Sequence, residues 1–348
     1  VQLVAMSDVF GDRIQAAYRQ LNSRYPGQLE VPRERRFTGL LGYRQLLEVD
    51  LDVVILATPP GFRPLHFEAA VAAGKHVFLE KPVAVDPMGV RRVLQAGASA
   101  QTRHLAVTVG LPHRHEQAYR ETIAQLQEGL IGNPLAMRVY RNGGGARQRP
   151  RQKNQRELEY QLRNWSYFSW LSGDQIVDRH IRNLDVANWL MDGYPHSANA
   201  QGGRTATRPE SVCGQTYTQF FCEFAYHGGA KVFSQCRHVA NCWNNNSEHL
   251  QATHGRADIS GGKIYDLEDQ RIWQTKAPRS GAQRQQDDLI AALRQGHTPN
   301  EIDYAAKSTL TAIMGRMAAY TGQVVTWQDA FCSESQLADV DRLASLDD

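Results

Sequence analysis

The run from Gly74 to Asp86 constrains the fold of this chain more than any other stretch. It contains a short apolar segment, His76–Leu79, bounded by turn residues, which is typical of a buried strand in a parallel sheet covered on both faces. Lys81 follows at the carboxyl end of that strand, where open α/β sheets bind their ligands. Partial burial there would lower the pKa of Lys81 toward the range of a general acid or base. A solvated lysine at a strand end is the competing interpretation.

The rest of the first third of the chain alternates in the same way. We expect strands over 1–6, 51–57, 76–79 and 105–110, and helices over 12–21, 66–73 and 88–100. Strands that alternate with helices of this length indicate βαβ units, a parallel sheet and right-handed crossovers. Thr58, Pro59 and Pro60 end one of these strands on the same edge as Asp8 and Lys81, so polar strand ends converge on one crevice.

Asp8 follows the first strand and suggests which dinucleotide the crevice would prefer. A carboxylate at such a strand tip accepts a hydrogen bond from the ribose 2′-OH of NAD and repels the 2′-phosphate of NADP. Taken by itself, Asp8 more commonly caps the helix that follows it, which is the competing interpretation. No Gly-x-Gly-x-x-Gly phosphate loop occurs in the sequence. We expect that a first βα unit of about 30 residues precedes Val1, rather than that the loop has been lost.

Length, charge and cysteines exclude several classes of protein. A chain of 348 residues is long enough for two domains, and its net charge of +3 is too small to indicate nucleic acid or an anionic membrane as the main partner. No apolar run approaches the roughly 18 residues of a membrane helix. The five cysteines form no CxxC pair, so the sequence predicts no metal site and no disulfide framework. The compartment stays open between cytoplasm and periplasm.

The order of several motifs resembles one known family. They are Asp8, Ala57–Pro60, His66, Ala73–Val77 and Glu80–Pro82. In this order and spacing they resemble the Gfo/Idh/MocA oxidoreductases, which include glucose–fructose oxidoreductase and inositol dehydrogenase. The resemblance covers nearly the whole chain except the absent phosphate loop. It implies a Rossmann domain that binds NAD, or less readily NADP, with Lys81 beside the nicotinamide and the substrate hydroxyl. The cofactor contacts it suggests are Asp8, Thr58, Pro59, Pro60, His66, Glu80 and Lys81.

The expected architecture is α/β followed by α+β. Residues 1–112 would form the dinucleotide-binding domain, N-terminally incomplete, and residues 113–300 a domain built on an open-faced, mainly antiparallel sheet. Residues 301–348 would contribute a helix that packs back toward the first domain. The open sheet face would join copies of the chain into a homo-oligomer, a dimer or tetramer. A basic, Gln-rich segment with Arg147, Arg149, Arg151, Lys153 and Arg156 is interpreted as a solvated loop.

A second chemical cluster lies between Trp165 and Asp185. Asp178, Arg182 and Asp185 are spaced at i, i+4 and i+7 and therefore share one helix face. The family carries Asp-x-x-x-His-x-x-Asp here, and the histidine is its usual proton-transfer partner. In this chain Arg182 takes the place of that histidine, and an imidazole occurs two residues earlier at His180. Because arginine cannot act as a base near neutral pH, either His180 replaces it, or Lys81 acts alone and Arg182 binds an anionic or oxygen-rich substrate.

These residues suggest a carbohydrate-active enzyme. Trp165 and Tyr167 could stack on the apolar face of a sugar ring, and Tyr304 is a further pocket candidate. We expect an NAD-dependent oxidoreductase in which Lys81, Asp178 and His180 handle the proton of a sugar or polyol hydroxyl. An NAD-dependent glycosidase, similar to α-N-acetylgalactosaminidases of the same architecture, is the close alternative. A non-catalytic nucleotide-sensing or scaffold protein is the second.

Overall fold

Two separate parallel sheets form the N-terminal part of the structure, a computed structural model that describes residues 1–145, 148–205, 214–278 and 280–347. Strand β1 (Met6–Asp8) pairs with β2 (Arg36–Thr38), and β3 (Val53–Leu56), β4 (His76–Leu79) and β5 (Val107–Val109) pair in the order β3-β4-β5. A doubly wound sheet has the strand order 3-2-1-4-5-6. In that numbering β2 and β1 correspond to strands 3 and 2, and β3, β4 and β5 correspond to strands 4, 5 and 6. Within the described residues no strand corresponds to strand 1, beside β3, where Ile55 is 62% exposed. The expected Rossmann-type parallel sheet is confirmed.

Helices cover both faces of the three-stranded sheet, as a parallel sheet requires. Helices α3 (Arg63–Ala72) and α4 (Pro87–Thr102) pack on the face that carries Val77 and Leu79. Helix α11 (Gly281–Arg294) covers the opposite face, where Leu289 packs on Phe78. Residues 281–300, which the sequence analysis placed with the second domain, therefore contact the first sheet. Helices α1 (Gly11–Arg24) and α2 (Gly42–Leu47) flank β1 and β2.

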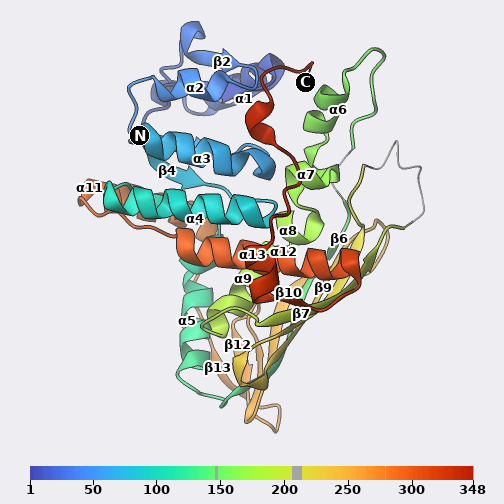
Figure 1. Ribbon diagram of the computed structural model, residues 1–348. Helices are drawn as coiled ribbons and strands as arrows, with labels where there is room; N and C mark the ends of the chain where they lie inside the picture. Colours follow the sequence, from blue (N-terminus) through green and yellow to red (C-terminus); the bar gives the residue numbers. More distant parts are fainter. Residues whose placement is uncertain (146–147, 206–213, 279, 348) are drawn as a thin grey trace.

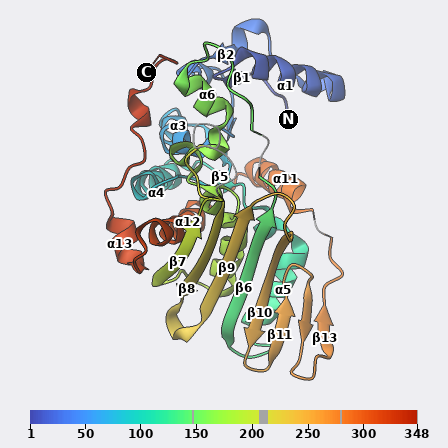
Figure 2. The same ribbon diagram turned by 90° about the vertical axis from the view of Figure 1, so that its right-hand side faces the viewer.

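A nine-stranded sheet forms the second part of the structure. Its order is β13-β12-β11-β10-β6-β9-β8-β7-β14, and only the central pair β6–β9 is parallel. The strands are β6 (Pro134–Gly143), β7 (Ser197–Gly203), β8 (Gln219–Ala225), β9 (Lys231–His238), β10 (Asn245–Ala252), β11 (Gly255–Asp258), β12 (Lys263–Tyr265), β13 (Arg271–Gln274) and β14 (Val325–Thr326). Helices lie on one face only, so the other face is open, and in Figure 2 it is turned toward the viewer. The expected open-faced, mainly antiparallel sheet is confirmed.

A helical layer lies between the two parts (Figure 1). Its helices are α7 (Ser169–Ser172), α8 (Gln175–Asp178), α9 (Ile181–Leu190), α12 (Ile302–Thr321) and α13 (Trp327–Cys332). Helix α5 (Gln117–Gln127) lies along the nine-stranded sheet, and α6 (Glu157–Arg163) lies beside the first part (Figure 1). Helix α12 packs on α4 on one side and on β7 and α9 on the other. Its Arg316 donates hydrogen bonds from one nitrogen to the carbonyl oxygens of Val85 (2.7 Å) and Gly173 (3.0 Å), one from each part of the chain. Within the described residues, no helix has the length and apolar character needed to cross a bilayer.

The contact of α12 with α4 depends on a glycine. A Cβ atom added to Gly97 would lie 2.6 Å from Cγ2 of Ile302, a side chain that is itself buried. Alanine normally stabilises a helix interior by up to about 1 kcal/mol relative to glycine. Here that gain is opposed by the overpacking, because Ile302 has no free space to move into.

We expect Gly97→Ala to lower the free energy of unfolding by about 1–2 kcal/mol, since overpacking of a close core contact typically costs about 1–3 kcal/mol. Thermal and urea unfolding measure the change. Gly11→Ala in α1 is the matched control, because the added Cβ would meet only Thr38 at an ordinary 3.5 Å. A Gly97→Ala protein as stable as the wild type would show that the two helices are not in this contact.

Candidate active site

Lys81 lies at the carboxyl end of β4 and reaches the start of the helical layer below it. Its Nζ donates a hydrogen bond to the backbone carbonyl oxygen of Asp178 (2.5 Å) and lies 3.4 Å from the Asp178 carboxylate. The side chains of both residues are about 90% buried. The structure thus brings together two residues 97 positions apart that the sequence analysis assigned to one site.

The surroundings of Lys81 favour its neutral form. Burial lowers the pKa of Lys81 to about 8, and the charges of Arg182 and Arg63 lower it further, whereas Asp178 and Glu80 oppose the shift. A lysine with such a pKa exists in both protonation states near neutral pH. It can therefore take up or give away a proton at an adjacent hydroxyl group.

Glu80 and Arg63 fix the backbone around Lys81. A Glu80 carboxylate oxygen accepts a hydrogen bond from the Lys81 backbone N–H (3.2 Å). Arg63 is buried at the start of α3 and donates to the carbonyl oxygen of Pro82 (2.7 Å). The Lys81–Pro82 peptide bond is cis. These contacts hold the turn after β4 in one conformation, so the position of the ammonium group is defined by backbone as well as side-chain contacts.

The predicted cofactor residues occupy the same carboxyl edge. Asp8 ends β1, and one of its oxygens accepts a hydrogen bond from the backbone N–H of Phe10 (2.9 Å), so the capping interpretation of Asp8 also applies. Thr58, after β3, lies with its hydroxyl 3.1 Å from Nδ1 of His66 on α3. Burial lowers the pKa of His66 to about 4, and its Nε2 is buried without a hydrogen-bond partner. Pro59 and Pro60 form the turn that leads into α3.

This edge fits part of a nicotinamide dinucleotide. His66 Nε2 is an unsatisfied buried polar atom that a ligand group could satisfy. The carboxylate of Asp8 is placed at a strand tip as a ribose site requires. For the pyrophosphate, the sequence contains no glycine-rich phosphate loop that would bind it. Residues of this chain therefore fit the ribose and nicotinamide ends of the group.

His180 lies behind the site rather than in it. The side chain is fully buried at the start of α9, and its Nε2 lies 2.7 Å from the hydroxyl of Ser234 on β9. Burial lowers the pKa of His180 to about 3, so the imidazole stays neutral near neutral pH. A side chain with no exposed surface does not contact a substrate in this conformation. The geometry gives no support to the predicted proton transfer by His180.

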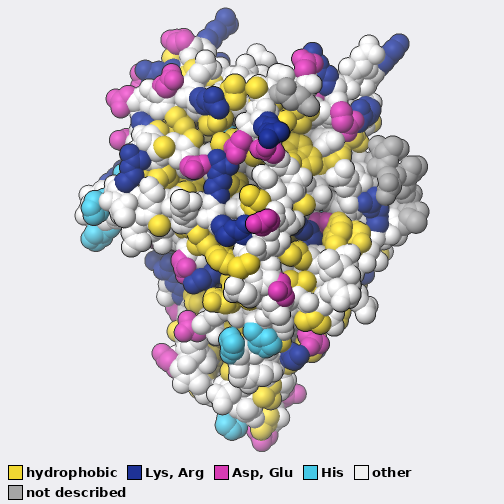
Figure 3. All heavy atoms as spheres, in the orientation of Figure 1, with side chains coloured by type: hydrophobic (Ala, Val, Ile, Leu, Met, Phe, Trp, Pro, Cys, Tyr) yellow, Lys and Arg dark blue, Asp and Glu magenta, His cyan; other side chains and the backbone are white. Residues whose placement is uncertain are grey.

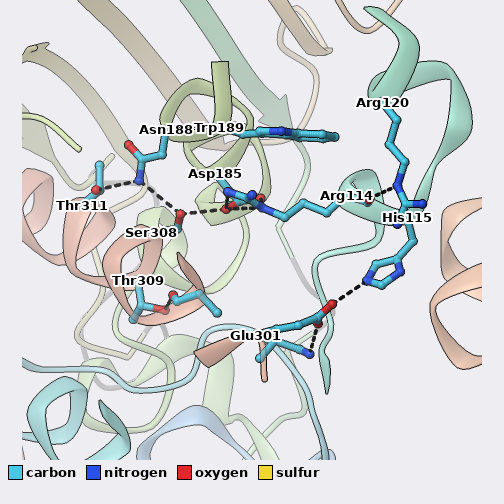
Figure 4. A network of polar contacts seen from close by, with 12 residues as sticks. Arg114, His115, Arg120, Asp185, Asn188, Trp189, Glu301, Ser308, Thr309 and Thr311 are labelled. Carbon is cyan, nitrogen blue, oxygen red and sulfur yellow. Dashed lines mark hydrogen bonds and ion pairs between the residues drawn. The ribbon is translucent and has the colours of Figure 1, made fainter. Parts of the chain in front are cut away.

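Asp185, in the middle of α9, belongs to a different cluster of polar contacts (Figure 4). Asp185 is 1% exposed and receives a bidentate pair of hydrogen bonds from Arg114 (2.9 Å each) and a third from Ser308 (2.8 Å). The guanidinium of Arg114 also lies over the ring of Tyr304, 3.9 Å from its centroid. Tyr304 lines a cavity of about 250 Å³ there together with Arg114 and Trp189. Among the described residues, neither Asp185 nor Tyr304 forms a hydrogen bond or ion pair with Lys81.

Trp165 and Tyr167 are partly buried and pack on a hydrophobic cluster that joins the two parts of the chain. Phe10 and Phe62 from the first part meet Phe168 and Leu171 from the segment around α7 in this cluster. The aromatic residues of this segment thus contribute to packing.

The basic loop is only partly described. Its Arg151 forms an ion pair with Glu157, whereas Arg147 lies outside the described residues. Cys213 also lies outside the described residues.

Sequence reasoning missed two arginines near Lys81. Arg179 follows Asp178 and lies 3.8 Å from its carboxylate. Arg141 projects from β6 on the face that carries Met137 and Val139. Burial lowers the pKa of Arg141, and the charges of Arg182 and Arg179 lower it further. The alternation of side chains along β6 could have revealed Arg141. It is a charged residue at a position where the strand otherwise turns apolar side chains inward.

Comparison with known proteins agrees with this geometry. Residues 11–111 match the model of an oxidoreductase family with an NAD-binding Rossmann fold, Gfo/Idh/MocA. Inositol 2-dehydrogenase of Klebsiella pneumoniae (strain 342) is 33% identical over 209 residues, which are 59% of this chain and 51% of that protein. Inositol 2-dehydrogenase of Acidothermus cellulolyticus is 30% identical over 156 residues, 44% of this chain and 39% of that protein. The aligned regions thus span about half or less of the curated relatives.

Solved structures extend the likeness of the fold to nearly the whole chain. The aldose–aldose oxidoreductase of Caulobacter crescentus, solved with glycerol, has a TM-score of 0.72 at 18% identity and covers 93% of this chain and 91% of its own. A levoglucosan dehydrogenase in complex with NADH and levoglucosan has a TM-score of 0.72 at 15% identity, with 93% and 90% covered. Residues 11–111 are therefore similar to the NAD-binding Rossmann domain of the Gfo/Idh/MocA oxidoreductases, and both sheets share the fold of the solved structures.

Proposed function

We propose that this protein is an NAD-dependent oxidoreductase that acts on a hydroxyl group of a sugar or polyol. The observation that carries the proposal is Lys81, a buried lysine with a pKa near 8 at the carboxyl edge of a dinucleotide-type sheet. The names of the relatives support the substrate class, since they include inositol 2-dehydrogenases, a levoglucosan dehydrogenase and an aldose–aldose oxidoreductase. We infer that the substrate hydroxyl lies at Nζ of Lys81.

Each residue of the site then has a defined task. In its neutral form Lys81 accepts the proton of the substrate hydroxyl at Nζ during oxidation, and as an ammonium it returns that proton in the reverse direction. Asp178 orients the lysine through its carbonyl oxygen and stabilises the charge that the lysine gains. A bound nicotinamide supplies the hydride chemistry. Thr58 and His66 would lie against that group, and Asp8 against its ribose.

The two alternatives receive less support. The glycosidase requires a further acid/base group for the leaving group, and His180, the residue considered for that task, is fully buried and neutral. A non-catalytic sensor or scaffold has no need for a buried lysine with a lowered pKa. One assay separates all three: oxidation of free sugars accumulates NADH, whereas redox-neutral glycoside cleavage does not, and a scaffold does neither.

The pH profile of sugar oxidation should report Lys81. Because the neutral amine is the base, kcat/KM should rise with pH through a midpoint near 8. Asp178→Asn removes a charge that raises the pKa of Lys81 and should move the midpoint to lower pH, whereas Arg182→Gln should move it to higher pH. Lys81→Met should lower turnover about 10²-fold or more and flatten this limb of the profile. NADH absorbance in initial-rate assays of the full-length protein measures these effects.

His180→Ala serves as the control for that experiment. Since His180 is neutral near neutral pH, its removal should leave the midpoint unchanged, while loss of its contact with Ser234 lowers the unfolding temperature. If a folded His180→Ala protein has lost its turnover, the result would support His180 as the residue that transfers the proton. A folded Lys81→Met protein with wild-type turnover would remove Lys81 from the mechanism.

Asp8 should set the preference for NAD over NADP. Asp8→Asn keeps an oxygen that accepts the hydrogen bond from Phe10 but removes the charge that would repel the 2′-phosphate. We expect the ratio of the dissociation constants, Kd for NADP over Kd for NAD, to fall about tenfold, the equivalent of about 1.4 kcal/mol. Calorimetric titration of wild type and variant with both dinucleotides measures it. Equal preference in wild type and variant would leave Asp8 as a helix cap alone.

We further propose that the open sheet face joins copies of the chain. Three large apolar side chains are exposed on or beside this face: Phe221 at 44%, Trp243 at 60% and Ile272 at 45%. A charge buried in such an interface is costly, so Phe221→Asp should shift the protein toward a smaller species. Light scattering coupled to gel filtration measures the mass. A wild-type protein that is monomeric at all concentrations would contradict the proposal.

A further inference from the structure

The arginines around Lys81 are not neutralised by the chain itself. Arg141 and Arg182 have no hydrogen bond or ion pair with any other described residue, and Nε of Arg182 is a buried atom without a partner. We propose that the substrate is an acidic sugar, one that carries a carboxylate, sulfate or phosphate group, and that Arg182 and Arg141 bind this group. The inference rests on the proposed function and names its substrate class.

Backbone geometry places Arg182 close to Asp178, which binds Lys81. Asp178 ends α8 and Arg182 lies in the first turn of α9, and the two linking residues, Arg179 and His180, keep right-handed helical backbone angles. The charge of Arg182 contributes to the lowered pKa of Lys81, which requires the two cations to be near each other. An anion held by Arg182 would therefore lie on the same side of the site as Lys81.

Sheet geometry brings Arg141 to the same place. His180, at the start of α9, contacts Ser234 on β9, and Ser234 is paired with Val139 on the neighbouring strand β6. Arg141 lies two residues beyond Val139 on the same face of β6, roughly 7 Å along the strand. It therefore approaches the start of α9 from the sheet, opposite Lys81, which approaches from β4.

The nearby carboxylates are already engaged. Asp178 is shared between Lys81 at 3.4 Å and Arg179 at 3.8 Å. Glu248, on the inward face of β10, accepts hydrogen bonds from Tyr119 (2.9 Å) and from Asn183. Burial raises the pKa of Glu248 as well, which further weakens it as a counter-ion. Both carboxylates attract Arg141, but within the described residues neither forms an ion pair or a hydrogen bond with Arg141 or Arg182.

Several arginines elsewhere in the chain form ion pairs. Arg114 binds Asp185, Arg163 binds Asp12, and Arg92 binds Glu68 and Asp341. The surface shown in Figure 3 likewise mixes basic and acidic side chains rather than gathering one sign. Partly buried cations that lack a partner are costly unless a ligand supplies the opposite charge. The planar guanidinium fork suits oxyanions, which it binds through two parallel hydrogen bonds.

Matched sugar pairs test the proposal directly. Binding of glucuronate and glucose, galacturonate and galactose, and glucose 6-phosphate, glucose 6-sulfate and glucose is measured by calorimetry on the full-length protein with NAD, and turnover by NADH absorbance. We expect at least one acidic sugar to bind about 100-fold more tightly than its neutral parent, because two charge-assisted hydrogen-bonding groups contribute. Its binding should weaken as sodium chloride is raised, whereas that of the neutral parent should not.

Two variants locate the binding group. Arg182→Lys keeps the charge but loses the fork, and Arg141→Gln loses both, so each should weaken binding of the acidic sugar about tenfold or more without affecting the neutral parent. Arg138→Gln, three residues earlier on β6 and exposed on the opposite face, is the matched control and should change nothing. The salt dependence of the wild type tests the inference even if a variant does not fold.

The outcomes for substrate class and for function are distinguishable. Neutral sugars that bind and turn over as well as all acidic ones, or variants that weaken both members of a pair equally, would overturn the acidic-sugar inference and leave the oxidoreductase intact. Salt-sensitive binding of an acidic sugar with no NADH formed from any sugar would support the anion site and overturn the proposed function.

Discussion

The contact between Lys81 and Asp178 is the constraint on which the rest of the site depends. It joins the carboxyl edge of a parallel sheet to the start of the helical layer on a second sheet, with the donor from one part of the chain and the acceptor from the other. A buried ammonium needs such a partner, because its desolvation is otherwise too costly. The backbone carbonyl oxygen of Asp178 provides it, and burial lowers the pKa of Lys81 to about 8 against the opposing charge of the Asp178 carboxylate. Proton transfer and the packing of the two parts therefore depend on the same few atoms.

Much of the fold could be predicted from local sequence. The strand over 76–79 forms with the predicted bounds, because a short apolar run between turns has few other structures available. Strands β8 and β9 pair as an antiparallel hairpin around the glycine-rich turn His227–Gly229. Helix α3 begins at Arg63, before the predicted His66, since a proline in the first helical turn is favourable. The sequence analysis did not predict that residues 281–300 pack on the first sheet. Amphipathic periodicity shows that one face of a helix is buried, but it does not show which element covers that face.

The site was less predictable, for a physical reason. Lys81, Asp178 and Arg182 were assigned from motif spacing, and the structure places Lys81 against Asp178. His180 and Asp185 share the same motif, yet one is buried against Ser234 and the other against Arg114. Which side of a one-turn segment faces a cavity depends on partners from distant strands, here β9 and the turn after β5. Arg141 was overlooked because β6 was examined as a strand and not as a wall of the site.

Helix α12 has a consequence for how a ligand enters. It contacts both sheets at once, and Arg316 ties backbone carbonyl groups from the two parts to one guanidinium. Motion of one part against the other would expose a buried arginine and separate Gly97 from Ile302. We therefore expect the two parts to keep a fixed relative orientation when a ligand binds at the crevice between them. Discrimination between ligands then depends on the fixed placement of charge and shape, and little binding energy is spent on closing the protein around its ligand.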